Sequence, residues 1–180
     1  MKIFISGGAK NGKSMFAQEC AKKLSEEDHL WYLATMEPRD SEDDARVARH
    51  RKEREGWGFK TAEWGRDLDL HKSEFDCKGT YLVDSVTALL SNEMFVGMSG
   101  DINKNAPEKV AKELLDFSDS VENVVFVSDN IHCDAAFYDD WTDSYREGLA
   151  FVDKKLVEKC DVVAEFCCGQ IIFYKGAELI

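Results

Sequence analysis

Short apolar runs alternate with longer amphipathic segments along most of this chain of 180 residues. The runs have the length of strands, and we expect strands at residues 3–6, 30–35, 59–64, 80–84, 123–128, 161–166 and 170–174. Apolar residues recur at helical spacing between them, which predicts helices over residues 14–24, 41–54, 85–96, 106–117 and 141–159. The run NVVFVS at 123–128 is typical of a parallel sheet covered on both faces. The pattern predicts an α/β fold, a three-layer sandwich around a mostly parallel sheet.

The last two expected strands are too close in sequence for a parallel connection. Only about three residues around Gly169 separate them, whereas a parallel crossover needs a dozen or more. We therefore expect a hairpin, which gives the sheet an antiparallel C-terminal edge strand. A chain of this length suits one domain with a sizeable core, so we expect residues 1–180 to form a single domain.

A glycine-rich turn joins the first expected strand to the first helix. It fits the pattern G-x-x-x-x-G-K-[ST], and strand, turn and helix in this order are the context in which that pattern binds phosphate. Backbone N–H groups of such a loop point at the β-phosphate, Lys13 reaches the β and γ oxygens, and the Ser14 hydroxyl holds Mg²⁺. The alternative is a glycine turn beside a surface lysine. We predict a P-loop that binds a nucleoside triphosphate through Gly7, Gly8, Ala9, Lys10, Asn11, Gly12, Lys13 and Ser14.

An acidic residue ends the expected strand at 80–84. In P-loop proteins, a carboxylate at the carboxyl end of a central strand lies beside the bound metal ion. A strand that ends in aspartate is common, so the assignment depends on the nearby P-loop. We predict that Asp84 is the metal-side carboxylate and that Ser14 and Asp84 together hold Mg²⁺.

The helix expected over residues 41–54, with Ser41 as its N-cap, carries a row of basic side chains. Arg46, His50 and Arg54 are spaced by four and therefore lie along one face. One interpretation is a solvated, charged helix. The other is a basic face that presents an imidazole to a nucleotide phosphate, where His50 acts as nucleophile or as acid and base.

The charge and the composition limit the partners and the location that we expect. The formal net charge is −12, so the chain repels the phosphate backbone of nucleic acids, and we expect no nucleic-acid partner. No charged-then-apolar leader and no run of about 18 apolar residues is present, so we expect no membrane segment and a cytoplasmic location. The six cysteines show no C-x-x-C pair, and we expect core thiols rather than disulfides or a zinc site.

Several stretches together resemble one known family. They are FISGGAKNGKS at the P-loop, YLVDSVTALLSNEMF, VVFVSDN and the C-terminal helix with its two strands. The most specific stretch is WYLATMEPRDSEDDARVARHRKEREGWGFKTAE, in which arginine, histidine and arginine recur at spacing four ahead of a tryptophan and Thr61-x-Glu63. In these residues the chain is similar to the bifunctional adenosylcobinamide kinases and adenosylcobinamide-phosphate guanylyltransferases of cobalamin biosynthesis.

This resemblance implies a two-step enzyme. A nucleoside triphosphate, ATP or GTP, first phosphorylates a side-chain hydroxyl of cobinamide, the corrinoid substrate. The histidine matching His50 then attacks the α-phosphorus of GTP, releases pyrophosphate and passes GMP to adenosylcobinamide phosphate. The resemblance also implies a RecA-type P-loop domain and assembly as a trimer. Beside Lys13 and Asp84, it implies catalysis by His50 and nucleotide contacts by Arg46, Arg54 and Glu63.

The chain departs from the family pattern after the strand at 123–128. It continues as Asp129-Asn130-Ile131-His132, where the family usually has Asn-Glu-Val-Gly, and we expect His132 to be a loop residue. Such changes lie where the corrinoid or a second nucleotide would be handled. Two alternatives therefore stand beside the bifunctional enzyme. One is a P-loop small-molecule kinase or NTPase that has lost guanylyl transfer, and the other is a nucleotide-binding module without turnover.

Overall fold

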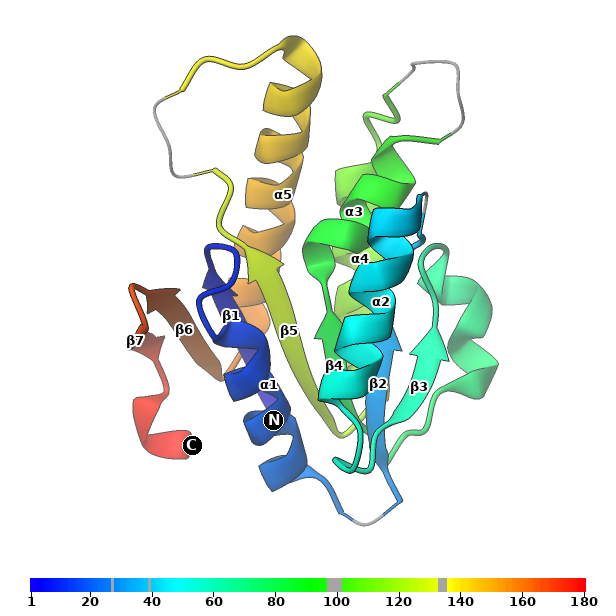
Figure 1. The fold of residues 1–180 in the computed structure, drawn as a ribbon, viewed down its shortest axis with the longest axis vertical. Coiled ribbons are helices and arrows are strands. Elements are labelled where there is room, and N and C mark those ends of the chain that lie inside the picture. Colours follow the sequence, from blue (N-terminus) through cyan, green and yellow to red (C-terminus); the bar gives the residue numbers. More distant parts are fainter. Residues whose placement is uncertain (27, 39, 97–101, 133–135) are drawn as a thin grey trace.

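One sheet of seven strands forms the middle layer of the described part of the molecule (Figure 1). The computed structural model describes residues 1–26, 28–38, 40–96, 102–132 and 136–180. The strands are β1 (Lys2–Gly7), β2 (Leu30–Ala34), β3 (Lys60–Glu63), β4 (Thr80–Asp84), β5 (Asn123–Asp129), β6 (Val162–Cys167) and β7 (Gln170–Lys175). Their order is β3-β2-β4-β5-β1-β6-β7, and every neighbouring pair except β6 and β7 is parallel. The predicted mostly parallel sheet is confirmed.

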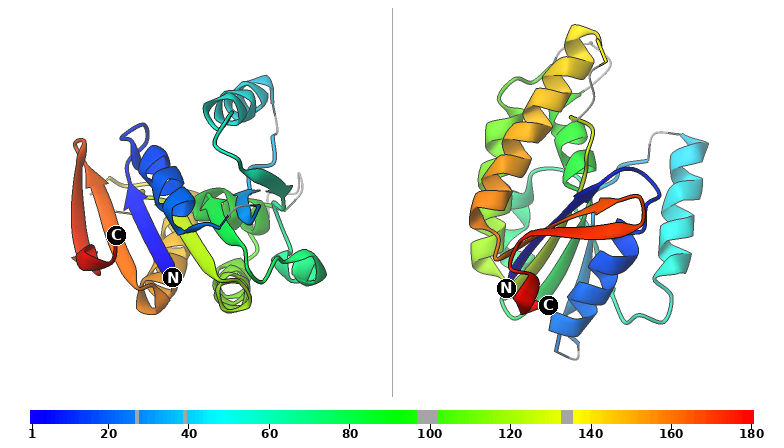
Figure 2. Two further views of the ribbon diagram at one scale, coloured as in Figure 1. Left: turned by 90° about the horizontal axis from the view of Figure 1, so that it is seen from below. Right: turned by 90° about the vertical axis from the view of Figure 1, so that its left-hand side faces the viewer.

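Helices cover both faces of this sheet. The α-helices in the described ranges are α1 (Lys13–Leu24), α2 (Ser41–Glu53), α3 (Val86–Met94), α4 (Ala106–Ser120) and α5 (Asp140–Lys159). Helices α1 and α2 lie on one face, and α4 and α5 lie on the other, where α3 packs with them (Figure 2). Two short 3₁₀ helices span Leu68–Glu74 and Ala177–Leu179. The predicted three-layer sandwich is confirmed. Among the described helices, none is both long enough and apolar enough to cross a membrane.

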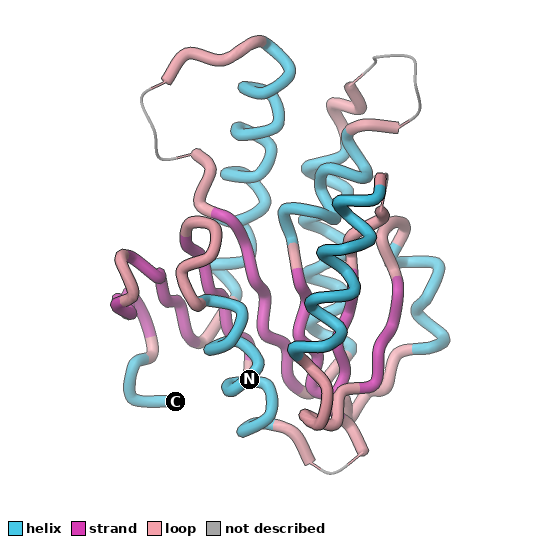
Figure 3. Tube along the Cα trace, in the orientation of Figure 1, coloured by secondary structure: helices cyan, strands magenta, loops and turns pink. Residues whose placement is uncertain are grey.

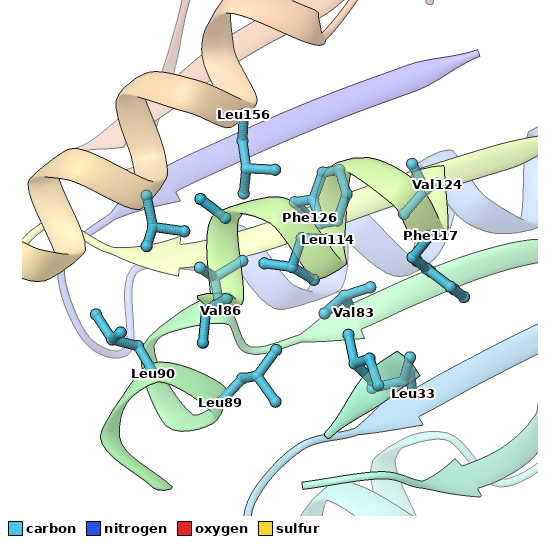
Figure 4. Close-up of a cluster of buried hydrophobic side chains, with 14 of the residues drawn as sticks. Leu33, Val83, Val86, Leu89, Leu90, Leu114, Phe117, Val124, Phe126 and Leu156 are labelled. Atoms are coloured by element: carbon cyan, nitrogen blue, oxygen red, sulfur yellow. The ribbon is translucent and has the colours of Figure 1, made fainter. Parts of the chain in front are cut away.

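Strand β5 explains why its sequence is apolar without alternation. Neighbouring strand residues point to opposite faces, and here both faces are buried. Val124 and Phe126 belong to the cluster that includes Leu114 of α4 and Leu156 of α5 (Figure 4). Val125 and Val127 belong to the cluster on the other face, which includes alanines of α1. A central strand covered on both sides excludes polar side chains from four successive positions.

The hairpin predicted at the C-terminus is present. Cys167 pairs with Gln170, so only two residues, Cys168 and Gly169, connect β6 to β7. Their φ angles are 51° and 77°, the left-handed conformation that the tight turns of two-residue hairpins require. Strand β7 is therefore the predicted antiparallel edge strand.

The prediction of core thiols is correct for two of the cysteines. Cys20 and Cys160 are buried, and burial raises their pKa values to about 11 and about 12. It is wrong for Cys77, Cys167 and Cys168, which are exposed. The sulfur atoms of Cys167 and Cys168 lie 4.0 Å apart because Cys168 belongs to the turn and not to the strand. Cys133 lies outside the described residues.

The strand order brings three chemically distinct segments to one edge of the sheet. Strands β1, β4 and β5 are parallel, so their carboxyl ends share an edge. The P-loop leaves β1 there, β4 ends at Asp84, and β5 ends at Asp129. In parallel α/β sheets this edge is where ligands bind.

Candidate functional site

The P-loop connects β1 to α1, as predicted (Figure 3). Lys10 and Gly12 have φ angles of 55° and 99°, so the loop curls through left-handed conformations. Lys13 is buried at the start of α1. Its ammonium group donates to the carbonyl oxygen of Gly8 at 3.0 Å and forms an ion pair with Asp129 Oδ1 at 2.7 Å. The ammonium group therefore lies over the start of the loop, where a phosphate group would be held.

Asn11 ties the loop to the neighbouring strand. Its Nδ2 donates to the carbonyl oxygen of Phe166 in β6 at 2.8 Å. Its Oδ1 accepts a hydrogen bond from the backbone N–H of Lys13 at 3.2 Å. The same amide side chain thus holds both the turn and the first residue of α1, which fixes the shape of the loop before a ligand arrives.

Gly7 is the position in the loop where a side chain is least tolerated. Its φ is 153°, and an added Cβ would lie 2.5 Å from Asn11 Nδ2 and 2.7 Å from the carbonyl oxygen of Phe166. We expect Gly7→Ala to lower the free energy of unfolding by about 1–3 kcal/mol, because the backbone or the Asn11 contact must shift. Chemical denaturation of the nucleotide-free protein measures this. Gly8→Ala is the matched control, since a Cβ there meets nothing within 4 Å; equal losses in both variants would contradict the explanation.

Asp129 is the site residue that sequence reasoning missed. Residue for residue, Asp129 pairs with Gly7 across β5 and β1, and its backbone N–H donates to Thr87 Oγ1 at 2.8 Å. Its carboxylate reaches Lys13 as described above. The available signal was an acid at the end of a buried strand, the same signal that selected Asp84. Only the strand order shows that β5, and not β4, lies next to β1.

Asp84 ends β4, as predicted, and its carboxylate accepts a hydrogen bond from Tyr32 Oη at 2.8 Å. In register, Asp84 pairs with Val127 of β5, two residues before Asp129. It therefore lies one strand farther from β1 than Asp129 does and farther back from the carboxyl edge. Its oxygens suit Mg²⁺, and so does the Ser14 hydroxyl. The predicted metal site built from these two residues stays a prediction.

A pocket of about 460 Å³ lies between α2 and the ends of β2, β3 and β4. This volume is within the usual range for small-molecule sites. Its lining includes five ionisable residues beyond Glu37: His50, Arg51, Arg54, Glu63 and Asp84. Three different elements and the residue after α2 contribute them, so the fold gathers residues that are far apart in sequence.

Two pairs of contacts organise the basic side of this pocket. The guanidinium of Arg54, a buried residue directly after α2, lies 3.4 Å from the ring centroid of Tyr32, a cation–π contact. Because Tyr32 also donates to Asp84, these residues link the helix end to β4. Arg51 forms an ion pair with Glu63 at 3.0 Å, and both side chains are largely exposed. Solvent weakens that second pair, so a ligand can displace it at little cost.

Helix α2 presents His50 to the pocket from its last turn. Its N-cap is Asp40 and not Ser41 as predicted: the Asp40 carboxylate accepts hydrogen bonds from Glu42 N and Asp43 N, both at 2.9 Å. Wherever the structure describes an α2 side chain, that side chain is not buried. The side chain of Arg46 lies outside the described part, so its predicted contact stays a prediction.

The predicted site residues fall into two groups. His50, Arg54, Glu63 and Asp84 line one pocket. The P-loop residues 7–14, all described, do not line it. Both groups lie on the face of the sheet that α1 and α2 cover (Figure 2). The nucleotide-binding elements are thus neighbours on one face without forming a single cavity.

His132 lies in the loop after β5, as expected. Its Nε2 lies 3.2 Å from Asp153 Oδ2, and that buried carboxylate also accepts a hydrogen bond from Ser128 Oγ at 3.0 Å. The hydrogen bond to Asp153 raises the pKa of His132. Arg146 donates to the carbonyl oxygen of Ile131 at 3.1 Å. These contacts tie the loop to α5.

Comparison with known proteins agrees with this arrangement. The bifunctional adenosylcobalamin biosynthesis protein CobU of Escherichia coli (strain K12) is 32% identical over 97 residues, which cover 53% of this chain and 51% of the relative. Its namesake in Salmonella typhimurium (strain LT2) is 30% identical over 110 residues, which cover 61% of this chain and 56% of the relative. The chain spans about half the length of these curated relatives.

Similarity of fold extends further than similarity of sequence. A solved structure whose title describes an ATPase domain superposes with a TM-score of 0.50 at 12% identity, over 91% of this chain and 68% of the other. At that identity the likeness concerns the fold alone, and it agrees with the predicted P-loop fold. The model of the family described as cobinamide kinase / cobinamide phosphate guanyltransferase matches residues 3–173. With nearly its whole length matched, the chain belongs to the cobinamide kinase / cobinamide phosphate guanyltransferase family.

Proposed function

We propose that this protein phosphorylates adenosylcobinamide with a nucleoside triphosphate and then transfers GMP from GTP to adenosylcobinamide phosphate through a guanylylated His50, in cobalamin biosynthesis. The observation that carries the proposal is that one pocket gathers His50, Arg54, Glu63 and Asp84 on the face that also holds the P-loop. Membership of the family supports the reaction type.

In the kinase step, the P-loop holds the triphosphate. Its backbone N–H groups and Lys13 neutralise the β and γ oxygens, and the start of α1 adds its positive partial charge. Ser14 and Asp84 hold Mg²⁺, whose charge stabilises the phosphates. The hydroxyl of the corrinoid then attacks the γ-phosphorus.

In the transferase step, an imidazole nitrogen of His50 attacks the α-phosphorus of GTP. The new N–P bond forms as the bond from the α-phosphorus to the bridging oxygen breaks, and pyrophosphate leaves with the electron pair. Arg54, together with Arg46, neutralises the charge that gathers on the α-phosphate oxygens. A phosphate oxygen of adenosylcobinamide phosphate then attacks the same phosphorus and releases His50.

The two steps require the P-loop and the His50 pocket to act on nucleotides in turn. Since residues 7–14 do not line that pocket, a nucleotide held by the P-loop meets His50 only if α2 approaches or a neighbouring subunit contributes one of the two parts. The unburied side chains described in α2 favour such an approach, because few contacts hold it in place. A homotrimer is part of the proposal.

Mass spectrometry of the protein after incubation with GTP and Mg²⁺ tests the function. We expect the mass of one GMP to be added at His50 and the adduct to be labile in acid. Addition of adenosylcobinamide phosphate should then discharge it. An unmodified protein that nevertheless phosphorylates adenosylcobinamide would contradict the transferase half.

A second candidate function is a P-loop kinase or NTPase without guanylyl transfer. The observation that favours it is the separation of the P-loop from the His50 pocket. It predicts triphosphate turnover that depends on Lys13 and no covalent adduct. The same mass measurement, combined with an assay of triphosphate hydrolysis, distinguishes the two.

A further inference from the structure

The carboxylate closest in the sheet to the P-loop belongs to Asp129. Gly7, the first residue of the loop, pairs with Asp129 in the register of β1 and β5. The carboxylate forms the 2.7 Å ion pair with Lys13, and its side chain is 35% exposed. It is therefore held at the P-loop and is still open to a ligand from solvent.

The register separates Asp129 from Asp84. Adjacent strands lie about 5 Å apart, so Asp84, on the second strand from β1, is about 10 Å to the side of Gly7. Its partner in β5 is Val127, which sets it a further two residues back, or about 6.6 Å, along the strand direction. The two acids therefore have different neighbours: Lys13 for Asp129, and Tyr32 for Asp84.

The position of Asp129 is fixed by its backbone and by the next residue. Its N–H donates to Thr87 Oγ1 at 2.8 Å, at the start of α3. Asn130 donates its backbone N–H to the carbonyl oxygen of Gly7 at 3.1 Å and its Nδ2 to Glu165 Oε1 at 2.9 Å. Groups from β1, β6 and α3 thus hold the end of β5, so the carboxylate is preorganised.

We propose that Asp129 is the general base of the phosphoryl transfer, a role that rests on the proposed kinase function. In the nucleotide-free protein, Lys13 neutralises Asp129. When a triphosphate enters the loop, Lys13 contacts its β and γ oxygens instead, and the Asp129 carboxylate becomes available to the acceptor hydroxyl next to the γ-phosphate.

The step balances as follows. The hydroxyl oxygen forms a bond to the γ-phosphorus while its proton passes to an oxygen of Asp129. The bond from the γ-phosphorus to the bridging oxygen breaks, and the nucleoside diphosphate leaves with the electron pair. Asp129 later returns the proton to water. No oxidant, reductant or further reactant is required.

The guanylyl-transfer steps need no such base. His50 attacks with a ring lone pair, and the phosphate of adenosylcobinamide phosphate is already ionised. The proposal therefore predicts a selective defect: loss of the carboxylate slows phosphorylation of the hydroxyl and spares formation of the GMP adduct. A purely structural role for Asp129 would affect both.

The test compares Asp129→Asn with Asp116→Asn under saturating ATP, Mg²⁺ and adenosylcobinamide. Asp116 carries an equivalent carboxylate 2.8 Å from Lys112 on α4, on the opposite face of the sheet. We expect kcat of Asp129→Asn to fall by about 10²–10⁴-fold, the usual contribution of a general base. Triphosphate affinity should stay equal or increase, because Lys13 no longer leaves an ion pair. Asp116→Asn should match the wild type in both.

Each outcome decides between the claims. Unchanged kcat with tighter triphosphate binding would mean that Asp129 only neutralises Lys13, and would overturn its role as base. Loss of both phosphorylation and the GMP adduct would also overturn it. No phosphorylation by the wild type would overturn the kinase function itself. If Asp129→Asn does not fold, Asp129→Glu replaces it: the displaced carboxylate should lower kcat by about 10-fold or more and leave the adduct intact.

Discussion

Lys13→Ala is expected to weaken triphosphate binding by at least about 100-fold, close to 3 kcal/mol. The ammonium group is buried at the start of α1 and already points at an anionic partner, Asp129. In the complex it contacts phosphate oxygens, and loss of one partner of a buried, hydrogen-bonded charge pair costs about 2–5 kcal/mol. Isothermal titration with ATP or GTP and Mg²⁺ measures the loss directly.

Lys112→Ala is the matched control for this experiment. Lys112 is also paired with an aspartate, Asp116, but on the exposed side of α4, so its removal should leave triphosphate affinity unchanged. Unfolding should differ little between the two variants, because the carboxylate that Lys13 leaves behind is partly exposed. Unaltered affinity in Lys13→Ala would show that residues 7–14 are not the triphosphate site.

His50→Ala is expected to abolish the covalent GMP adduct, a loss of at least about 10³-fold in its rate of formation, because alanine offers no nucleophile. The kinase activity should be retained, since the pocket that His50 lines does not include the P-loop. The measurement is labelling with GTP that carries radioactive α-phosphate, followed by mass spectrometry of the modified peptide.

His71→Ala is the histidine control. His71 lies in a 3₁₀ helix, where its Nδ1 contacts Glu74 Oε1 at 2.9 Å, and it does not line the His50 pocket. It should label as the wild type does. Full labelling of His50→Ala would assign the nucleophile to another residue, and loss of kinase activity in the same variant would mean that His50 also contacts the kinase nucleotide.

Local patterns in the chain carried the fold and the anion site. The P-loop lies within eight consecutive residues, and the strand and helix around it follow from apolar spacing alone. The unbroken apolar run of β5 indicated a strand covered on both faces, and the short connection at Gly169 indicated the hairpin; both are confirmed. These features depend on neighbours in sequence, so sequence suffices for them.

The boundaries that failed depend on details at segment ends. Asp40 and Ser41 are both good N-cap residues, and only the backbone conformation decides that Asp40 caps α2. The exposed cysteines were misjudged because burial at a turn or a hairpin tip depends on whether another layer covers it. Cys167 and Cys168 lie at such an uncovered tip.

The sequence by itself determined that this protein has a three-layer α/β fold, a P-loop and a basic helix with His50, because each is written in residues that are close together. Only the tertiary structure decided which acid meets Lys13 and which residues share the pocket with His50. Asp84 and Asp129 end similar strands, and their difference arises because β5 inserts between β4 and β1. Strand order is set by packing over the whole sheet, which no single stretch of the chain records.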